Sequence, residues 1–331
     1  MPIILDAMGS DKYPDPEIEG VVEAVKLLEE SVILVGDKPL LTEKLNALSP
    51  NHPKISIEHA PEVVDMWDKP VESAKSKPNN SMAVGIGLVK EGRGQAFVTA
   101  GNTGGAMFNS LRVLGRIKGV QRPALNATFP TRKGRCVVVD IGANADCRPD
   151  FLVQFGIMGS IYAQFLLDIE NPKIGLLSNG EEPGKGNQLV KDTYKLFEES
   201  GLNFYGNVEP KELFGGGVDV AVTDGFTGNV LVKTSEAIAK MITDVLKEEL
   251  MGSTRTKLGA LLAKPAFARM KNLIDPSEVG AAPLLGVDGL VFVGHGRSDA
   301  RAIVSSLLLA EKAIKSGLLV NIKEKISEKL G

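Results

Sequence analysis

The chain has few of the residues that usually bind metals or form disulfides. Cys136 and Cys147 are its only cysteines, they form no Cys-x-x-Cys pair, and there are three histidines in 331 residues. A disulfide framework, a cysteine zinc site and a histidine-rich metal site are therefore not expected, and a reducing cytoplasm fits this content. A Gly-x-Ser-x-Gly motif is also missing, so no serine stands out as a nucleophile.

Excess positive charge and long apolar runs are lacking as well. The net charge is −3 and the isoelectric point about 5.8, which argues against a nucleic-acid binder. The start, MPIILDAMGSD, is typical of a strand rather than a signal peptide. The best candidate for a membrane-spanning segment, Phe151 to Leu167, is at the lower limit of length for this role, so we expect it to be buried in a core or in a dimer interface.

A glycine-rich loop with a lysine follows the apolar run KIGLLS. The loop, Ser178 to Asn187, reads SNGEEPGKGN and precedes a helical pattern. It lacks the Gly-Lys-Ser/Thr of a P-loop, and no Gly-x-Gly in the chain has the third glycine of the dinucleotide fingerprint. A P-loop nucleotidase and a standard dinucleotide-dependent dehydrogenase are thus disfavoured. A lysine near a helix N-terminus still suits an anion, which makes Lys185, Gly186 and Asn187 candidates for binding phosphate.

Apolar runs alternate with helical patterns along the whole chain. Several runs are continuous rather than alternating, as in strands that are covered on both faces. The expected strands lie at 3–7, 32–36, 54–60, 96–101, 136–142, 173–178, 218–225 and 290–296. Helical stretches such as 17–30 and 235–250 fill the gaps, so the sequence predicts a three-layer α/β/α, doubly wound, mostly parallel sheet. No linker is visible, and residues 1–331 are expected to form a single α/β domain.

Polar residues and glycines follow many of these strands. Ligands of a doubly wound sheet bind beyond the carboxyl ends of its strands, so we expect the loops to line one rim. The candidates are Asp6, Gly101, Asn102, Thr103, Gly104, Asn144, Lys185, Gly186, Asn187, Asp224, Gly225, Asn229 and His295. Each has a local alternative, such as an Asx turn for Asp224, a helix cap for Asn102 or Asn229, or a backbone-bonded loop for His295.

Residues 250–275 combine basic charge with apolar spacing. No acidic residue occurs between Leu250 and Ile274, and Pro265 is expected to divide the segment into two short helices. This excursion would be a protruding pair of basic amphipathic helices that contacts an anionic membrane or an acidic partner. The alternative is a hairpin packed on the domain or on a second subunit. The contact residues would be Arg255, Lys257, Leu258, Leu261, Leu262, Lys264, Phe267, Arg269 and Lys271.

Several motifs together resemble one protein family. In chain order they are LDAMGSD, TAGNTGG, VVDIGANADCRPDFLVQFGIMGS, GEEPGKGN, YGNVEP, VTDGFTGNVLVKT and APLLGVDGLVFVGHG, between residues 5 and 296. The set is similar to that of the bacterial phosphate acyltransferase (PlsX) family. Small exchanges occur on loops, for example Ser10 where a second glycine is usual.

The resemblance implies a reaction in which acyl-[acyl-carrier-protein] and inorganic phosphate give acyl phosphate and free carrier protein. The product would feed glycerol-3-phosphate acylation in phospholipid synthesis, and the enzyme of that step is a further implied partner. The resemblance also implies a phosphate acetyltransferase-like fold, a homodimer and peripheral association with the inner face of the membrane. No metal or organic cofactor is implied.

Such a reaction suits the candidates. Phosphate is already an anion near pH 7 and the leaving thiol has a pKa of about 8.5, so positioning and oxyanion stabilisation matter most. Lys185 and Asn187 would hold phosphate beside Asn102 and Thr103, and His295 would bind the oxyanion or the phosphate. Asp224 and Asn229 would orient this network, with Asn144 and Asp6 supporting it.

The sequence is compatible with other functions. An acyltransferase that uses acyl-CoA, a metal-dependent decarboxylating dehydrogenase on a related fold and a membrane-surface scaffold for lipid enzymes are the alternatives. The dehydrogenase would need a cluster of aspartates and several arginines, which the loops lack. Direct attack by phosphate is expected, but the sequence also permits an acyl-enzyme formed on Cys147.

Overall fold

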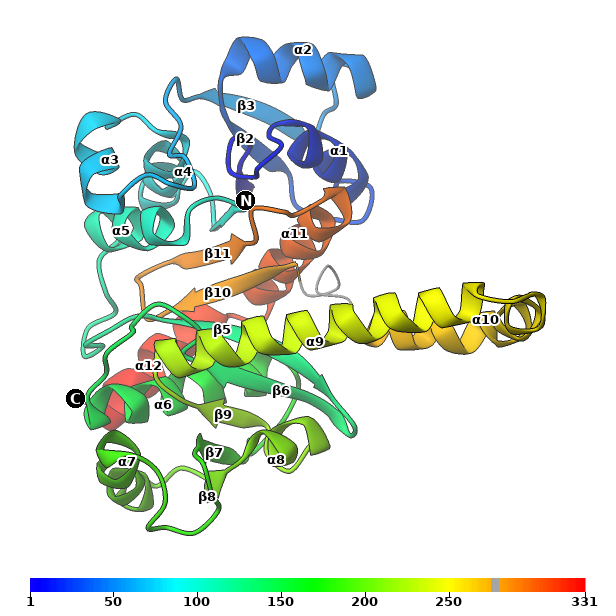
Figure 1. Cartoon of the computed structure of the whole chain (residues 1–331). Coiled ribbons are helices and arrows are strands. Elements are labelled where there is room, and N and C mark those ends of the chain that lie inside the picture. Colours follow the sequence, from blue (N-terminus) through cyan, green and yellow to red (C-terminus); the bar gives the residue numbers. More distant parts are fainter. Residues whose placement is uncertain (275–279, 331) are drawn as a thin grey trace.

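One mixed sheet runs through the molecule (Figure 1). The computed structural model describes residues 1–274 and 280–330, without the side chains of residues 268, 271–274 and 330. The strand order is β3-β2-β1-β4-β11-β10-β5-β6-β9-β7-β8. The strands are β1 (Ile3–Asp6), β2 (Val32–Gly36), β3 (Ile55–His59), β4 (Ala96–Thr99), β5 (Ala124–Thr131), β6 (Gly134–Val139), β7 (Ile174–Leu177), β8 (Phe204–Val208), β9 (Val220–Val222), β10 (Ala281–Leu285) and β11 (Leu290–Gly294).

The strands form two parallel groups that run in opposite directions. β1, β2, β3, β4 and β11 are mutually parallel, and so are β6, β7, β8 and β9. Between the groups, β10 is antiparallel to β11 and to β5, and β5 is antiparallel to β6. The predicted mostly parallel sheet is confirmed, but β5, β8 and β10 were not among the expected strands.

Helices cover both faces of the sheet, which confirms the three-layer prediction. One layer holds α1, α2, α6, α7, α11 and α12, and the other holds α3, α4, α5, α8 and α9. The bounds are α1 (Asp15–Ala24), α2 (Lys38–Leu48), α3 (Pro70–Ser76), α4 (Ser81–Lys90), α5 (Thr103–Val113), α6 (Pro149–Leu166), α7 (Gln188–Glu199), α8 (Pro210–Gly215), α9 (Gly225–Met251), α10 (Thr254–Ile274), α11 (Ala300–Lys315) and α12 (Leu318–Leu330). Double cover explains why strands such as β1 have consecutive apolar residues, since Ile3 and Leu5 face one layer and Ile4 the other.

The apolar run from Phe151 to Leu167 is the buried helix α6. Its glycines allow close contact: a Cβ on Gly156 would lie 2.6 Å from Phe197, and one on Gly159 would lie 2.9 Å from Val220. The expectation of burial is therefore confirmed. No helix in residues 1–274 and 280–330 has both the length and the hydropathy needed to span a bilayer.

α9 and α10 project together from the body of the molecule (Figure 1). They pack against each other, and the chain reverses between them at Gly252 and Ser253. The prediction of two short helices divided at Pro265 is wrong, because α10 continues through this proline. A proline inside a helix removes one backbone hydrogen bond, and the contact with α9 supports the helix along its length. The projecting pair thus consists of the long α9 and α10.

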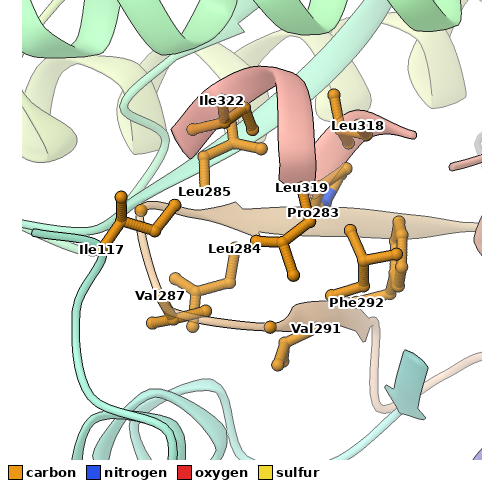
Figure 2. A pocket seen from close by; sticks show the side chains of 13 residues that line it. Ile117, Pro283, Leu284, Leu285, Val287, Val291, Phe292, Leu318, Leu319 and Ile322 are labelled. Carbon is orange, nitrogen blue, oxygen red and sulfur yellow. The ribbon is translucent and has the colours of Figure 1, made fainter. Parts of the chain in front are cut away.

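A small apolar cavity lies between β10, β11 and α12 (Figure 2). Its volume is about 10 Å³, and apolar side chains such as Leu284, Leu285, Leu318 and Ile322 line it. A space of this size holds at most one water, which would need polar partners. The cavity is therefore a packing gap of the core rather than a ligand site.

Candidate functional site

The loops after β1 and β4 meet at a buried carboxylate. Asp6 ends β1 and is fully buried. Its carboxylate accepts hydrogen bonds from Thr99 Oγ1 at 2.7 Å and from the Met8 N–H at 3.0 Å. Burial raises the pKa of Asp6, while these hydrogen bonds oppose the rise. A Cβ on Gly9 would lie 2.8 Å from the nitrogen of Gly101, so the two loops are in direct contact. The Asp6 carboxylate holds both loops through its bonds to Met8 and Thr99.

Asn102 fixes the start of α5. Its Oδ1 accepts the Gly105 N–H at 2.9 Å, and its Nδ2 donates to the carbonyls of Asp65, Met66 and Asp68 at 3.1 Å each. The side chain therefore caps the helix and holds the loop that precedes α3. The neighbouring Thr103 is exposed at the helix N-terminus, where free N–H groups favour an anion.

The loop after β6 is organised by Asp140, which sequence reasoning did not select. Its carboxylate accepts hydrogen bonds from the N–H groups of Leu125, Gly142, Ala143 and Asn144, and from Asn144 Nδ2. Burial raises its pKa, and these bonds favour the charged form. An aspartate at the carboxyl end of a buried apolar strand, as at Asp6, could have indicated Asp140 from the sequence.

The start of α9 sits on this loop. Asp224 caps the helix by accepting the Thr227 N–H at 2.8 Å, and the Gly225 N–H donates to the Asn144 carbonyl at 2.8 Å. A Cβ on Gly225 would lie 2.6 Å from that carbonyl oxygen. Asn229 lies one turn further along, where its side chain faces Gly142. The structure thus brings Asn144, Asp224, Gly225 and Asn229 together, as predicted.

His295 and Gly296 follow β11, and together they contact three other segments. The Gly296 carbonyl accepts the Asp11 N–H at 2.7 Å, and Gly296 also packs against Met66. His295 Nε2 lies 3.2 Å from the ammonium of Lys233 on α9. Burial lowers the pKa of His295, and Lys233 lowers it further, so the ring is neutral near pH 7. Lys233 was not predicted, although its spacing of four residues from Asn229 on one helix could have indicated it.

Lys185 lies in a separate loop after β7. Gly186 has a φ of +93° and donates its N–H to Asn179 Oδ1 at 2.9 Å, while Asn187 caps α7 by accepting the Val190 N–H at 3.0 Å. The Lys185 side chain is exposed. In the part of the chain that the structure describes, no hydrogen bond or ion pair joins its ammonium to another candidate residue.

The prediction that all these loops line one rim is wrong. β11 and β6 run in opposite directions, since β10 and β5 reverse the chain between them. The carboxyl ends of β1, β4 and β11 therefore leave one edge of the sheet, and those of β6, β7 and β9 leave the other. Helix α9 connects the loops of the two strand groups, because it starts beside Asp140 after β6 and its Lys233 contacts His295 after β11.

Cys147 lies half-buried near the start of α9. Burial raises the pKa of its thiol to about 12, and Asp140, Asp224 and Asp146 add to this rise. The reactive form of a cysteine is the thiolate. The surroundings of Cys147 therefore disfavour the thiolate that an acyl-enzyme would require.

The residues predicted to meet a membrane or partner lie along α10. Leu258, Leu261 and Leu262 are exposed, and so are Arg255, Lys257, Lys264 and Arg269. Phe267 is partly buried. The side chain of Lys271 falls outside the part of the structure that is described. Basic and apolar groups therefore share the surface of the projecting helix, as expected.

Comparison with known proteins agrees with these features. Residues 1–321 match the family model described as "Fatty acid synthesis protein". A protein of Elusimicrobium minutum named Phosphate acyltransferase is 49% identical over 329 residues, which cover 99% of this chain and 96% of that protein. A protein of the same name from Alkaliphilus oremlandii is 46% identical over 327 residues, which cover 99% and 98%.

Solved structures show the same fold at low sequence identity. A phosphotransacetylase from Streptococcus pyogenes matches with a TM-score of 0.60 and 19% identity, over 95% of this chain and 94% of that one. The EutD phosphotransacetylase from Staphylococcus aureus matches with a TM-score of 0.59 and 16% identity, over 96% and 94%. The predicted phosphate acetyltransferase-like fold is thereby confirmed. Because the family model spans nearly the whole chain, the chain belongs to the family of fatty acid synthesis proteins, in which the relatives above are named phosphate acyltransferase.

Proposed function

We propose that the protein transfers an acyl group from acyl-[acyl-carrier-protein] to inorganic phosphate and so releases acyl phosphate for phospholipid synthesis. The observation that carries this proposal is the 49% identity, over 99% of the chain, to a protein named Phosphate acyltransferase. The loops support it, since they offer backbone N–H groups, amides, a lysine and a neutral histidine but no thiolate.

The chemistry needs few groups. A phosphate oxygen attacks the thioester carbonyl and forms a C–O bond, the C–S bond then breaks, and the proton of the phosphate ends on the departing sulfur. Lys185 and Asn187 would hold the phosphate, and His295 would hydrogen-bond to the phosphate or the oxyanion. Asp224 and Asn229 would orient this network. Preorganised donors of this kind commonly contribute a factor of about 10²–10³ each to the rate.

We further propose that the pair formed by α9 and α10 provides contact with other molecules. Its exposed leucines and basic side chains suit an anionic membrane surface or the acidic carrier protein. α9 also exposes Ile238, Met241, Ile242 and Val245, which are apolar groups that a homodimer would cover. Peripheral attachment at the inner membrane face would place the product near a glycerol-3-phosphate acyltransferase.

Trapping of the product tests the reaction. The purified protein would be incubated with palmitoyl-[acyl-carrier-protein] and inorganic phosphate, and acyl phosphate would be captured with hydroxylamine. Phosphate-dependent hydroxamate, with an equal amount of free carrier protein, is the expected result. Faster product formation from palmitoyl-CoA would favour the CoA-dependent alternative. Absence of product from both donors would contradict the proposal and return attention to a scaffold role.

A further inference from the structure

One face of α9 has a row of polar side chains that extends from the loop after β6 to the loop after β11. Asn229, Lys233 and Glu236 follow each other at spacings of four and three residues, which places them on the same side of the helix. Asn229 faces Gly142 in the loop after β6, and Lys233 faces His295 after β11. The stripe therefore spans the junction between the two strand groups.

The Lys233 ammonium lies between the His295 ring and the Glu236 carboxylate. Its ammonium lies 3.2 Å from His295 Nε2 and 3.5 Å from the Glu236 carboxylate, and its side chain is 56% exposed. The solvent-screened pair with Glu236 is weak. An arriving dianion can therefore replace Glu236 as the partner of the ammonium at little cost.

The ring of His295 is surrounded by donors. Nε2 faces the Lys233 ammonium, and Nδ1 lies 3.3 Å from the backbone nitrogen of Arg297. Lys233 and Arg297 disfavour a second proton on the ring, while Glu236 and Asp11 favour it. Burial and the two cations prevail, which lowers the pKa and leaves a neutral imidazole. In the tautomer that carries its hydrogen on Nδ1, the lone pair of Nε2 lies on the side of Lys233 and can take an incoming proton.

We propose that Lys233 is the cation that binds the reacting phosphate beside His295. This inference rests on the proposed function and extends it, because it assigns the phosphate to the junction formed by α9 rather than to the loop of Lys185 alone. Phosphate bound there passes its proton to His295 as its oxygen bonds to the acyl carbon. His295 then returns this proton to the sulfur as the C–S bond breaks, so that charge and atoms balance.

The helix supports such a site in a second way. Asn229 lies about one turn before Lys233 on the same side of α9, and its side chain faces Gly142 in the loop after β6. A phosphate beside Lys233 would thus meet the Asn229 amide as well as His295, which follows β11.

Replacement of Lys233 by methionine tests the assignment. Loss of a charge-assisted hydrogen bond should raise the KM for phosphate about tenfold to a hundredfold, with the KM for the acyl donor unchanged. Lys233→Arg should keep part of the affinity. Lys240→Met is the matched control, since this exposed lysine on α9 pairs with Asp244 at 2.9 Å and lies away from His295. A KM for phosphate within twofold of wild type in Lys233→Met would overturn the proposal.

A measurement without turnover separates this proposal from the reaction itself. The chain has three histidines, so His295 can be followed by NMR, with a His295→Asn variant for assignment. Inorganic phosphate should shift the His295 signals of the wild type but not those of Lys233→Met, and the pKa of His295 should rise in that variant. If phosphate shifts both proteins alike, Lys233 is not its ligand. If the wild type responds to phosphate but forms no acyl phosphate, the proposed reaction fails and the phosphate site stands.

Discussion

Gly228 in α9 lies directly against the backbone of Asp140. A Cβ at Gly228 would overlap the Asp140 carbonyl oxygen. It would also lie 3.0 Å from the Asp140 carbonyl carbon and 3.1 Å from the Cα of Ile141. Backbone atoms cannot rotate away as a side chain can. The contact joins α9 to the loop that Asp140 organises, and it holds the helix in the position from which Lys233 reaches His295.

The Gly228→Ala variant should therefore be less stable than the wild type. Overpacking against backbone costs about 1–3 kcal/mol, which exceeds the gain of up to about 1 kcal/mol that alanine brings in a helix. Urea denaturation would measure the difference. Gly87→Ala is the control, because a Cβ on Gly87 in α4 would meet no other atom within 4 Å, and this variant should be as stable as the wild type or more so. Equal stability of Gly228→Ala and the wild type would contradict the close contact.

A buried glutamate links stability to pH. Glu17 in α1 is fully buried, its Oε1 accepts the Ser10 N–H at 2.9 Å, and its Oε2 has no partner in the described part of the chain. Burial raises its pKa from 4.5 to about 7, and nearby Asp6 adds to the rise. The folded state thus binds a proton more tightly than the unfolded state does. Stability should fall as the pH rises from about 4.5 to about 7, by about 3 kcal/mol in all.

Glu17→Gln should remove the part of the pH dependence that Glu17 contributes. Glutamine keeps an oxygen for the Ser10 N–H and cannot ionise. The stability of the variant should therefore rise relative to that of the wild type as the pH rises. Urea denaturation at pH 5 and pH 8 would compare the two proteins. Glu19→Gln, an exposed neighbour on the same helix, serves as the control. If the stabilities of the wild type and of Glu17→Gln change by the same amount between these pH values, the proposed role of Glu17 is disproved.

The sequence revealed most of the fold and part of the site. Continuous apolar strands and helical spacing predicted the layers, because burial on both faces leaves a local signal. β5 and β10 were not expected, since Pro130 and Pro283 interrupt their patterns and proline is usually excluded from central strands. Because β5 and β10 lie between the two strand groups, these groups run in opposite directions. A prediction that omits the two strands therefore places all the loops on one rim. The contact between Lys233 and His295 spans 62 residues and depends on that reversal, so local patterns could not reveal it.

Lys185→Ala tests the other proposed phosphate contact. If Lys185 also binds phosphate, the KM for phosphate should rise about tenfold or more, because a charged hydrogen bond is lost. Lys191→Ala, a change of the same charge on the exposed side of α7, should leave the KM unchanged. A normal dependence on phosphate in Lys185→Ala would remove this lysine from the site and leave Lys233 as the proposed ligand.

Charge reversal on α10 tests membrane attachment. Changing Lys257, Lys264 and Lys271 to glutamate should weaken binding to vesicles that contain phosphatidylglycerol by at least about tenfold, since each lysine near an anionic surface contributes about 1 kcal/mol. Vesicle sedimentation measures this. Reversal of the exposed Lys26, Lys69 and Lys325 on the body changes the net charge equally and should have a much smaller effect. Undiminished binding of the α10 variant would assign these residues to another partner.

Cys147→Ser distinguishes direct attack from an acyl-enzyme. With the pKa of the thiol near 12, almost no thiolate exists at neutral pH, so the serine variant should keep most of the activity. The exchange also keeps a short polar side chain beside Gly225, which limits structural damage. Rapid mixing with acyl-[acyl-carrier-protein] in the absence of phosphate, followed by mass spectrometry, should find no acylated protein. An acyl adduct on Cys147, together with an inactive serine variant, would replace direct attack by a two-step transfer and move the chemistry from His295 to the start of α9.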